Sequence, residues 1–424
     1  MGDARRRDRR RRRRHGRVHR RRPRSRTPRR ADDGPRGTGP PALAGPDRDR
    51  GQRARRGDRP RGRRRDRHGA VRLRDRPGRS LVPRAPPPGR GWRGPRPHGH
   101  DRGVSTEVRV GIVGRGFGDR VVAPVFAATE ACAVVDVVSP RDEMAVRALC
   151  ARRDVDLIAV HSPPFLHREH VGWAIDAGHA VLCDKPFGRD LADAEVMLAR
   201  AEAAGVVHLL NFEFRCQPGR AALRALVLDG TVGTPEHVLW AQYSAGSRHP
   251  LRPFGWLFDA SLGGGWIGAW GSHAIDFLRW TFGEVDTAAA VRRTTVALRP
   301  DADGRPQPCT AEDGFTATLR TQAGVSVAID TTFVAPTNQP GRIVVLGSAG
   351  VLESTGDHRI VVRTDAGSRE AFVLAPEPGD PHLVPMRRWA EAVRDAVRGD
   401  GAGPDVPTFR DGVACARVMD ALRA

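Results

Sequence analysis

Lysine is almost absent from this chain. Of the 71 lysines and arginines in its 424 residues, only Lys185 is a lysine. Lysine and arginine are interchangeable where a side chain only has to carry a positive charge. Apart from residue 185, every such position in this chain is an arginine. Arginine, whose pKa lies above about 12, cannot release a proton at neutral pH, whereas lysine can. The sequence therefore predicts that Lys185 acts in proton transfer rather than as a surface charge.

Other features are also missing, and each absence excludes a class of protein. The 6 cysteines form no Cys-x-x-Cys pair, which argues against a disulfide framework and against a metal site. No apolar run approaches the roughly 18–20 residues of a membrane span. The N-terminus lacks the apolar core of a secretory signal. We therefore expect a cytoplasmic protein with reduced thiols, no metal and no membrane-spanning segment.

The positive charge is confined to the N-terminal part of the chain. Residues 1–103 hold 38 arginines and 10 aspartates, whereas residues 104–424 hold 33 cations and 39 acids. A segment so rich in arginine, proline and glycine buries too little apolar surface to offset its chain entropy. We therefore expect residues 1–103 to form a disordered Arg-rich extension.

Two interpretations of this extension remain open. It could be an arm that binds nucleic acid through its phosphates. Against this, Trp92 is its only aromatic residue, and single-strand binders usually interleave aromatic side chains for stacking. The other interpretation is that residues 1–103 are translated upstream sequence and that the native protein starts at Val104. We favour the second interpretation and do not expect nucleic acid as a partner.

Residues 104–232 alternate short β-branched runs with segments of helical periodicity, which is typical of a parallel α/β sheet. The predicted strands are Val108–Val113, Val134–Ser139, Leu157–His161, Ala180–Asp184 and Val206–Asn211.

Residues 233–424 follow a different pattern, in which β runs are separated by Gly, Asp and Pro turns. This pattern predicts a second, α+β domain with a mostly antiparallel sheet, which is also a candidate surface for a homo-oligomer. Helices near Leu383–Val397 and Arg410–Leu422 are expected to pack back on the body. The predicted strands are Glu236–Tyr243, Phe315–Thr321, Val325–Phe333, Arg342–Leu346, Val351–Glu353, Arg359–Arg363 and Glu370–Leu374.

A glycine-rich turn follows the first predicted strand and precedes a helix. Gly114 permits the tight turn, and Gly116, before Phe117, lets the backbone approach a pyrophosphate at the helix N-terminus. The third position of the Gly-x-Gly-x-x-Gly pattern is Asp119, with Gly118 one residue early. The turn still predicts a dinucleotide site because of its strand–turn–helix context.

The second predicted strand ends in Ser139-Pro-Arg141. NAD enzymes usually place an acid here, which binds the ribose 2′-hydroxyl. A hydroxyl and a guanidinium suit a 2′-phosphate instead. The sequence therefore favours NADP over NAD, unless Arg141 is only an exposed residue at a helix start.

Polar residues also follow the later parallel strands, where open α/β sheets place their ligands. The motifs are His161-Ser162-Pro163-Pro164-Phe-Leu-His167, Cys183-Asp184-Lys185-Pro186, Asn211-Phe-Glu213-Phe-Arg215 and Gly263-Gly-Gly-Trp266…Gly271-Ser-His273…Asp276.

In this combination and order, the chain from about Val108 onward resembles the glucose–fructose oxidoreductase / inositol dehydrogenase (Gfo/Idh/MocA) family. Asp-Lys-Pro is a variant of that family's Glu-Lys-Pro motif. The resemblance implies a Rossmann domain followed by a domain with an open antiparallel sheet. It also implies that Lys185 contacts both nicotinamide and substrate and that His273 is the acid or base at the substrate hydroxyl. The residues expected to bind the cofactor are Gly114, Gly116, Phe117, Ser139, Arg141, Ser162, Pro163, His167, Asp184, Lys185 and Asn211.

A sugar or polyol substrate is expected to lie beside these residues. Asp276 either orients His273 or interacts with the helix dipole, and the tryptophans either stack on a sugar ring or belong to the core. Many relatives carry an aspartate four positions before the histidine, where this chain has Ala269. Acid/base chemistry is therefore assigned to Lys185 and His273 alone. The expected substrate-binding residues are Arg215, Trp256, Trp266, His273 and Asp276.

The connection between the second and third predicted strands is short. Residues 140–153 hold one helix, about Glu143–Arg152, whereas a full βαβ unit takes roughly 30 residues. The Rossmann domain is therefore expected to lack a strand and to have a thinner adenine side. The leading hypothesis is an NAD(P)-dependent sugar or cyclitol oxidoreductase. The alternatives are a catalytically impaired dinucleotide-binding protein and a nucleic-acid-binding fusion.

Overall fold

The computed structural model describes residues 107–400, 403 and 405–424. The expectations for residues 1–103, both the disordered extension and the start at Val104, lie outside the described residues. Within the described ranges, no helix is both long enough and apolar enough to cross a membrane.

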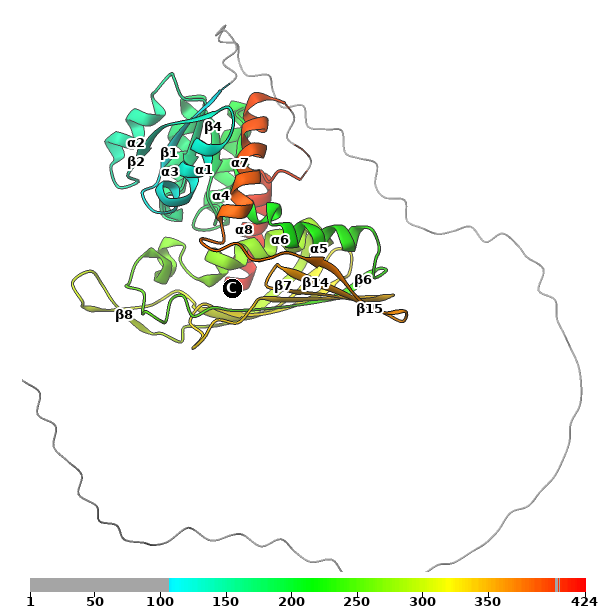
Figure 1. The fold of residues 1–424 in the computed structure, drawn as a ribbon. Helices are drawn as coiled ribbons and strands as arrows, with labels where there is room; N and C mark the ends of the chain where they lie inside the picture. Colours follow the sequence, from blue (N-terminus) through cyan, green and yellow to red (C-terminus); the bar gives the residue numbers. More distant parts are fainter. Residues whose placement is uncertain (1–106, 401–402, 404) are drawn as a thin grey trace, which may run out of the picture. The chain divides into compact units, whose positions relative to one another are not determined.

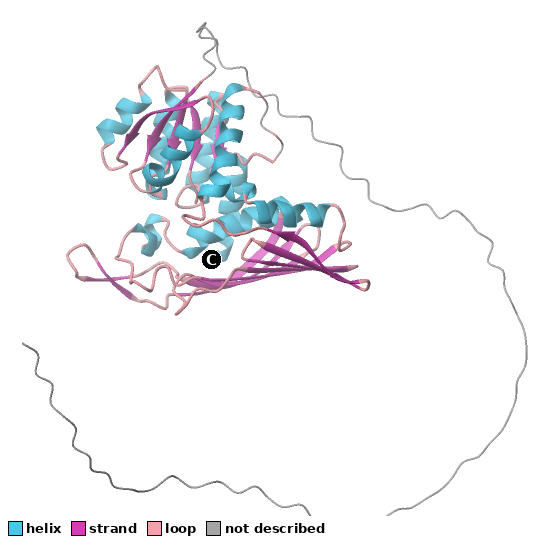
Figure 2. Ribbon diagram, viewed as in Figure 1, coloured by secondary structure: helices cyan, strands magenta, loops and turns pink. Residues whose placement is uncertain are grey.

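The first part of the described chain forms a five-stranded parallel sheet with helices on both sides (Figures 1 and 2). Apart from the edge strand at Cys132–Val138, its strands are almost continuously buried, as Leu157–Val160 shows with four fully buried residues, which is typical of a parallel sheet covered on both faces. In the sheet order the strands are β2 (Cys132–Val138), β1 (Val108–Val113), β3 (Leu157–Val160), β4 (Ala180–Cys183) and β5 (His208–Leu210). The connecting helices are η1 (Gly118–Val122), α1 (Ala123–Ala128), α2 (Glu143–Cys150), α3 (Pro164–Asp176) and α4 (Leu191–Ala204).

β1 pairs directly with β2 on one side and with β3 on the other. The described residues 139–156 between β2 and β3 contain α2 but no strand. β2 is therefore an edge strand of this sheet.

An eight-stranded sheet follows, and its neighbours are antiparallel except for the parallel pair β6 and β11. The prediction of a mostly antiparallel second sheet is confirmed. The sequence patterns missed β7, β8 and β9, the last two of which form a separate ribbon. In the sheet order the strands are β15 (Gly367–Val373), β14 (Arg359–Thr364), β13 (Gly350–Thr355), β12 (Arg342–Gly347), β6 (Pro235–Tyr243), β11 (Ser326–Thr332), β10 (Gly314–Thr321) and β7 (Val285–Arg293), and the ribbon is β8 (Leu298–Pro300) with β9 (Pro306–Pro308).

Helices α5 (Pro218–Leu228) and α6 (Ser272–Phe282) lie over one face of this sheet (Figure 1). Trp240 of β6 packs edge-on against Phe277 of α6, with ring centroids 5.6 Å apart. This face forms the buried core of the second part of the chain.

The C-terminal helices α7 (Leu383–Arg398) and α8 (Phe409–Arg423) return to the parallel sheet. Trp389 of α7 belongs to the buried cluster that includes β1. Phe409 of α8 contacts Phe187 after β4, with centroids 4.4 Å apart. The chain therefore crosses between the two sheets more than once, and a boundary between residues 104–232 and 233–424 stays a prediction.

Candidate active site

Asp184 connects the loops that follow three neighbouring strands. Its Oδ1 accepts hydrogen bonds from the Lys185 backbone N–H (2.9 Å) and from the Asn211 amide (3.1 Å), and Nδ1 of His161 lies 3.3 Å from Oδ2. Burial alone would raise the pKa of the Asp184 carboxyl, but His161 and Lys185 hold it well below its usual range. Asp184 is therefore a carboxylate that fixes the backbone beside the lysine.

Lys185 extends from the end of β4 to the second part of the chain. The half-buried side chain donates from Nζ to the backbone oxygen of Ala269 at 3.1 Å. Ala269 lies in η5 (Ile267–Gly271), a π-helical turn that leads directly into α6. A backbone carbonyl four positions before His273 thus binds the lysine.

His273 lies in the first turn of α6 and is 3% exposed. Its Nε2 lies 3.8 Å from Oε1 of Glu213, and neither ring nitrogen has a hydrogen-bond partner within the described residues. Burial, followed by the positive charges of Lys185 and Arg220, holds the pKa of His273 well below its ordinary value. The imidazole is therefore neutral near pH 7 and is close enough to Lys185 to sense its charge.

Glu213 and His382 complete this group, although the sequence patterns predict a role for neither residue. Glu213 is completely buried in η2 (Glu213–Cys216), after β5. Its Oε1 accepts a hydrogen bond from Nδ1 of His382 at 2.5 Å. His382 immediately precedes α7 and stacks on Phe214, with centroids 5.0 Å apart. Glu213 stands between two phenylalanines directly after a buried strand, and this context indicates that its carboxyl is buried. Nothing in the sequence links it to a histidine 169 residues away.

The glycine turn lies beside the same residues. Gly114 has a φ of +151°, and a Cβ there would lie 2.7 Å from the His161 carbonyl oxygen. A Cβ on Gly116 would meet nothing within 4 Å. The ring of Phe117 lies 5.7 Å from that of His161 and 5.0 Å from that of His382. The turn is therefore tight at its first glycine, open at its second, and adjacent to the histidines of the site.

These residues fit a dinucleotide. Helical structure runs from Gly118 through η1 and α1, so the open glycine lies just before a helix start. Asp119, the acid that departs from the glycine pattern, is exposed. In the described part of the chain, Oδ1 of Asn211 is a buried polar atom without a partner, as are both ring nitrogens of His273. Buried polar atoms normally have partners, so these atoms are available to a bound ligand.

The other expected cofactor residues surround this turn at the ends of β2 and β3. Ser139 Oγ accepts from the backbone N–H of Arg141 at 3.3 Å, and the Arg141 side chain is exposed. Ser162 precedes Pro163, its carbonyl contacts His167 Nε2 at 2.7 Å, and burial lowers the pKa of His167 to about 4. His167 is therefore an uncharged residue that supports Ser162 from inside the protein. The direct cofactor contacts of these residues stay predictions.

Arg215 and Asp276 are bound to one another. Arg215 donates from Nε and Nη2 to the two carboxylate oxygens of Asp276, at 2.9 and 2.5 Å. Nη2 also donates to Asp411 at 2.8 Å. The side chains of Arg215 and Asp276 are only 7% and 3% exposed. Their expected substrate contacts stay predictions, and the geometry gives both residues a role in joining η2, α6 and α8.

Trp256 and Trp266 lie in a small apolar cluster between η3 (Trp256–Phe258), η4 (Ala260–Leu262) and the sheet. Trp266 stacks on Phe333 with an interplanar angle of 2° and donates from Nε1 to Thr331 Oγ1 at 2.9 Å. Both tryptophans are half-buried, so each packs in this cluster and keeps some exposed surface. Contact with a substrate stays a prediction.

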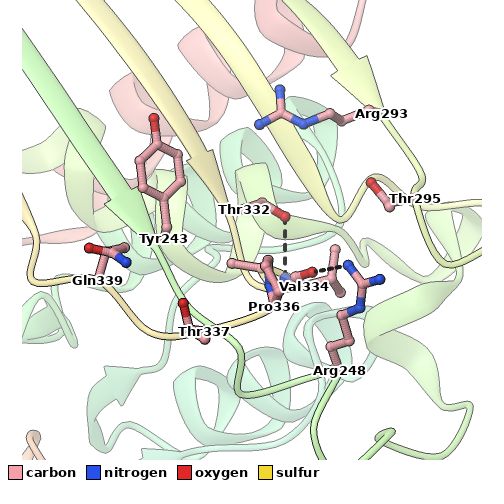
Figure 3. A pocket seen from close by; sticks show the side chains of 10 residues that line it. Tyr243, Arg248, Arg293, Thr295, Thr332, Val334, Pro336, Thr337 and Gln339 are labelled. Carbon is pink, nitrogen blue, oxygen red and sulfur yellow. Dashed lines mark hydrogen bonds between the residues drawn. The ribbon is translucent and has the colours of Figure 1, made fainter. Parts of the chain in front are cut away.

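A cavity of about 390 Å³ lies elsewhere, at one end of the eight-stranded sheet (Figure 3). On one face of the sheet, Asp330 accepts hydrogen bonds from Tyr243, at 2.7 Å, and from Arg293. Thr331, which follows Asp330 in the strand, accepts from Trp266 on the opposite face. Because successive strand residues point to opposite faces, this cavity lies across the sheet from Trp266. None of the expected site residues lines it; the lining residues are Tyr243, Arg248, Arg293, Thr295, Thr332, Val334, Ala335, Pro336, Thr337 and Gln339.

Comparison with known proteins identifies the family. Residues 108–212 match the oxidoreductase family with an NAD-binding Rossmann fold, and residues 221–353 match the GFO/IDH/MocA C-terminal domain. An uncharacterized oxidoreductase of Synechocystis sp. is 30% identical over 272 residues, which cover 60% of this chain and 73% of that protein. The D-apiose dehydrogenase of Paraburkholderia graminis is 30% identical over 61% of this chain and 69% of that protein. The chain belongs to the Gfo/Idh/MocA family.

As a Gfo/Idh/MocA protein, the chain is an oxidoreductase with an NAD-binding Rossmann domain, as the sequence predicts. Inositol 2-dehydrogenase 1 of Saccharopolyspora erythraea is 25% identical over 75% of this chain and 94% of that protein. A solved levoglucosan dehydrogenase in complex with NADH and levoglucosan has a TM-score of 0.66 at 22% identity, covering 75% of this chain and 96% of that chain. This structural likeness shows that the fold is shared. Within the described residues, no cluster of histidine, cysteine and acidic side chains could hold a metal ion.

Proposed function

We propose that this oxidoreductase interconverts a secondary hydroxyl of a sugar or cyclitol with the corresponding ketone, using a nicotinamide cofactor. The observation that carries the proposal is the bond from Lys185 to the turn that leads into the helix of His273, beside the glycine turn. The names of the D-apiose and inositol dehydrogenases among its relatives support a polyhydroxylated substrate.

A bound nicotinamide would supply the acceptor for the hydride of the carbinol C–H bond. The residues of this chain handle the hydroxyl proton. Lys185 has three N–H groups, and the carbonyl of Ala269 engages one of them. The remaining N–H groups of Lys185 are then available to the substrate oxygen. His273 is neutral and buried, and its ring nitrogens have no hydrogen-bond partner in the described part of the chain, so one of them is free to face the hydroxyl proton.

We further propose that the cofactor is NADP rather than NAD. Arg141 is exposed directly after β2, where a 2′-phosphate would lie. Asp136, the acid within β2, lies 4.0 Å from the guanidinium of Arg152 instead. We expect NADPH to bind at least about tenfold more tightly than NADH, because a charge-assisted pair contributes about 1.5–3 kcal/mol. Fluorescence titrations of both nucleotides should show this preference, and Arg141→Ala should abolish it.

The proposed reaction is tested with the purified full chain, a panel of sugars and cyclitols, and NAD or NADP. We expect polyol-dependent reduction of the nicotinamide. Lys185→Ala and Lys185→Arg should each lower kcat/KM by about 10²–10⁴-fold, the usual effect of removing a general acid or base. Lys185→Arg is the sharper variant, because it retains the positive charge but cannot release a proton.

Arg387→Ala is the matched control, because Arg387 is an exposed cation whose contact is with Glu377. Its kinetics should equal those of the unaltered chain. Failure of the unaltered chain to bind either nucleotide would contradict the proposal. Nucleotide binding without turnover of any polyol would favour a catalytically impaired family member, and full activity of Lys185→Arg would remove Lys185 from the chemistry.

A further inference from the structure

His273 is poorly suited to accept a proton without help. It is buried, and the cations Lys185 and Arg220 lower its pKa. An imidazolium formed there needs a compensating negative charge, because an unpaired buried charge is costly. Residue 269, four positions before His273, is an alanine, which offers no charge, and its backbone oxygen binds Lys185.

Among the described residues, Glu213 brings a carboxylate close to this ring. Its Oε1 lies 3.8 Å from Nε2 of His273, whereas Nδ1 of His273 is buried with no partner among the described residues. A distance of 3.8 Å exceeds the usual 2.7–3.2 Å or so of a hydrogen bond. Catalytic hydrogen bonds are often long in the free enzyme and shorten when substrate binds. A shift of under about 1 Å would close this one.

His382 holds Glu213 in place. Its Nδ1 lies 2.5 Å from the same Oε1, and its ring packs between Phe214 and Phe117, with centroids 5.0 Å from each. The completely buried Glu213 side chain is therefore fixed at one oxygen. The charged and titratable groups around His273 are Lys185 after β4, Glu213 in η2, Arg220 in α5 and His382 before α7.

We propose that Glu213 is a positioning residue that orients His273. Its carboxylate selects the tautomer of His273 that carries hydrogen on Nε2, and leaves Nδ1 to exchange a proton with the substrate hydroxyl. When Nδ1 takes that proton, the carboxylate of Glu213 stabilises the positively charged ring. The hydrogen bond between Glu213 and His382 stays in place during this step. The inference rests on the proposed oxidoreductase function and deepens it, because it supplies the negative charge that a protonated, buried His273 needs. The partner of one ring nitrogen commonly sets the tautomer of a histidine in this way.

The kinetic test compares Glu213→Gln, Glu213→Asp and the unaltered full chain. Glutamine retains the shape of the side chain but not its charge, so kcat should fall by about 10²–10⁴-fold with nucleotide Kd unchanged, as when the acid of a catalytic triad is neutralised. Glu213→Asp should recover at least about tenfold of this loss, since it restores the carboxylate. His382→Gln should cost on the order of tenfold, the scale seen for outer-shell partners.

Glu353→Gln is the matched control, because Glu353 pairs with Arg342 and Arg363 on the eight-stranded sheet. This variant should leave kcat unchanged. The pH profile adds a readout that a structural role would not move. The acidic limb of kcat/KM should differ between the Glu213→Gln variant and both the unaltered chain and Glu213→Asp.

A second test needs no turnover. In the nucleotide-free protein, the ¹⁵N shifts of the His273 ring should show hydrogen on Nε2, and Glu213→Gln should remove this preference. The ring of His237 serves as the internal reference, because it contacts Ser326 within the eight-stranded sheet and not Glu213. Failure of the unaltered chain to reduce nicotinamide would count against the proposed function, whereas these spectra decide the role of Glu213 by themselves.

Three results would overturn the role of Glu213. They are a Glu213→Gln variant with kcat within about twofold of the unaltered chain, identical His273 tautomers in both proteins, or hydrogen on Nδ1 in the unaltered chain. If Glu213→Gln does not fold, His382→Gln decides the question, because it removes the group that holds Oε1 of Glu213. Full activity and an unchanged His273 tautomer in His382→Gln would equally reject the proposal.

Discussion

Arginine and lysine have separate uses in this chain. The guanidinium of Arg215 donates hydrogen bonds to carboxylates of α6 and α8. Its contact with Asp276 of α6 has the bidentate geometry that suits arginine. The side chain of Lys185 instead makes one hydrogen bond, to a backbone carbonyl, in the described part of the chain. Two of its N–H groups remain for ligands. An arginine bonded like Arg215 would have few N–H groups left for a ligand. The single lysine lies where such groups are needed.

The Arg215 cluster leads to a prediction about stability. Arg215→Met should lower the free energy of unfolding by about 3–5 kcal/mol, because it leaves the buried carboxylates of Asp276 and Asp411 without their cation. Arg359→Met is the control, since the side chains of Arg359 and its partner Glu370 are 53% and 55% exposed and exposed pairs contribute about 1 kcal/mol or less. Urea denaturation measures both variants. A raised KM with unchanged stability in Arg215→Met would instead support substrate binding by Arg215.

At the scale of elements, two π-helical turns lie next to the candidate site. η1 follows the glycine turn, and η5 carries Ala269, the acceptor of Lys185, into α6. Such wide turns occur often at functional sites. Each places a loop beside the buried His273 region without ending the helix that follows it.

The two glycines of the cofactor turn should respond differently to alanine. Gly114→Ala places a Cβ 2.7 Å from the His161 carbonyl oxygen at a φ of +151°, so it should cost about 1–3 kcal/mol of stability as well as nucleotide binding. Gly116→Ala meets no atom within 4 Å, so it should weaken nucleotide binding but leave stability unchanged. Thermal unfolding and nucleotide titration separate the two effects. Equal stability of both variants would contradict this account.

Elements with a simple hydrophobic pattern could be predicted from the sequence. The parallel strands are short buried runs, and the glycine turn and Asp184-Lys185-Pro186 lie at their ends. β7 was missed because Val285–Arg293 mixes alanines with charged residues, and β8 and β9 because prolines lie within them. The contact between Glu213 and His382 joins positions far apart in the sequence, and no periodicity indicates such a pair.

At the scale of the whole molecule, the C-terminal segment completes the parallel sheet. Thr408 forms a β-bridge with Leu209, and the backbone N–H of Leu210 donates to the Pro407 carbonyl at 3.0 Å. This segment covers the outer edge of β5, which reduces the exposed hydrogen-bonding groups that make edge strands prone to pairing with other chains.

Buried histidines should make the folded state sensitive to acid. Burial lowers the pKa of both His167 and His170 from 6.5 to about 4. As the pH falls below 6.5, the unfolded chain therefore binds protons that the folded chain does not bind. Their stabilising contribution is complete above pH 6.5 and is lost as the pH approaches 4, at about 1.4 kcal/mol per pH unit for each histidine.

Urea unfolding at pH 7.5, 6 and 5 should therefore show a falling free energy of unfolding. In His170→Gln the slope with pH should decrease by about one proton, since one titrating group is removed. A free energy of unfolding that stays constant between pH 7.5 and 5 would show that these histidines remain accessible to protons in the folded protein.

The acceptor of Lys185 is part of the main chain, and this limits what mutation can do to it. Every amino acid at residue 269 provides a carbonyl oxygen, so replacing the Ala269 side chain cannot delete the hydrogen-bonding group. A peptide oxygen also does not titrate, so the acceptor is present at every pH at which the protein is folded. A substitution at residue 269 that keeps the backbone of η5 therefore leaves the acceptor of Lys185 in place, and an alignment of side chains would not reveal the contact.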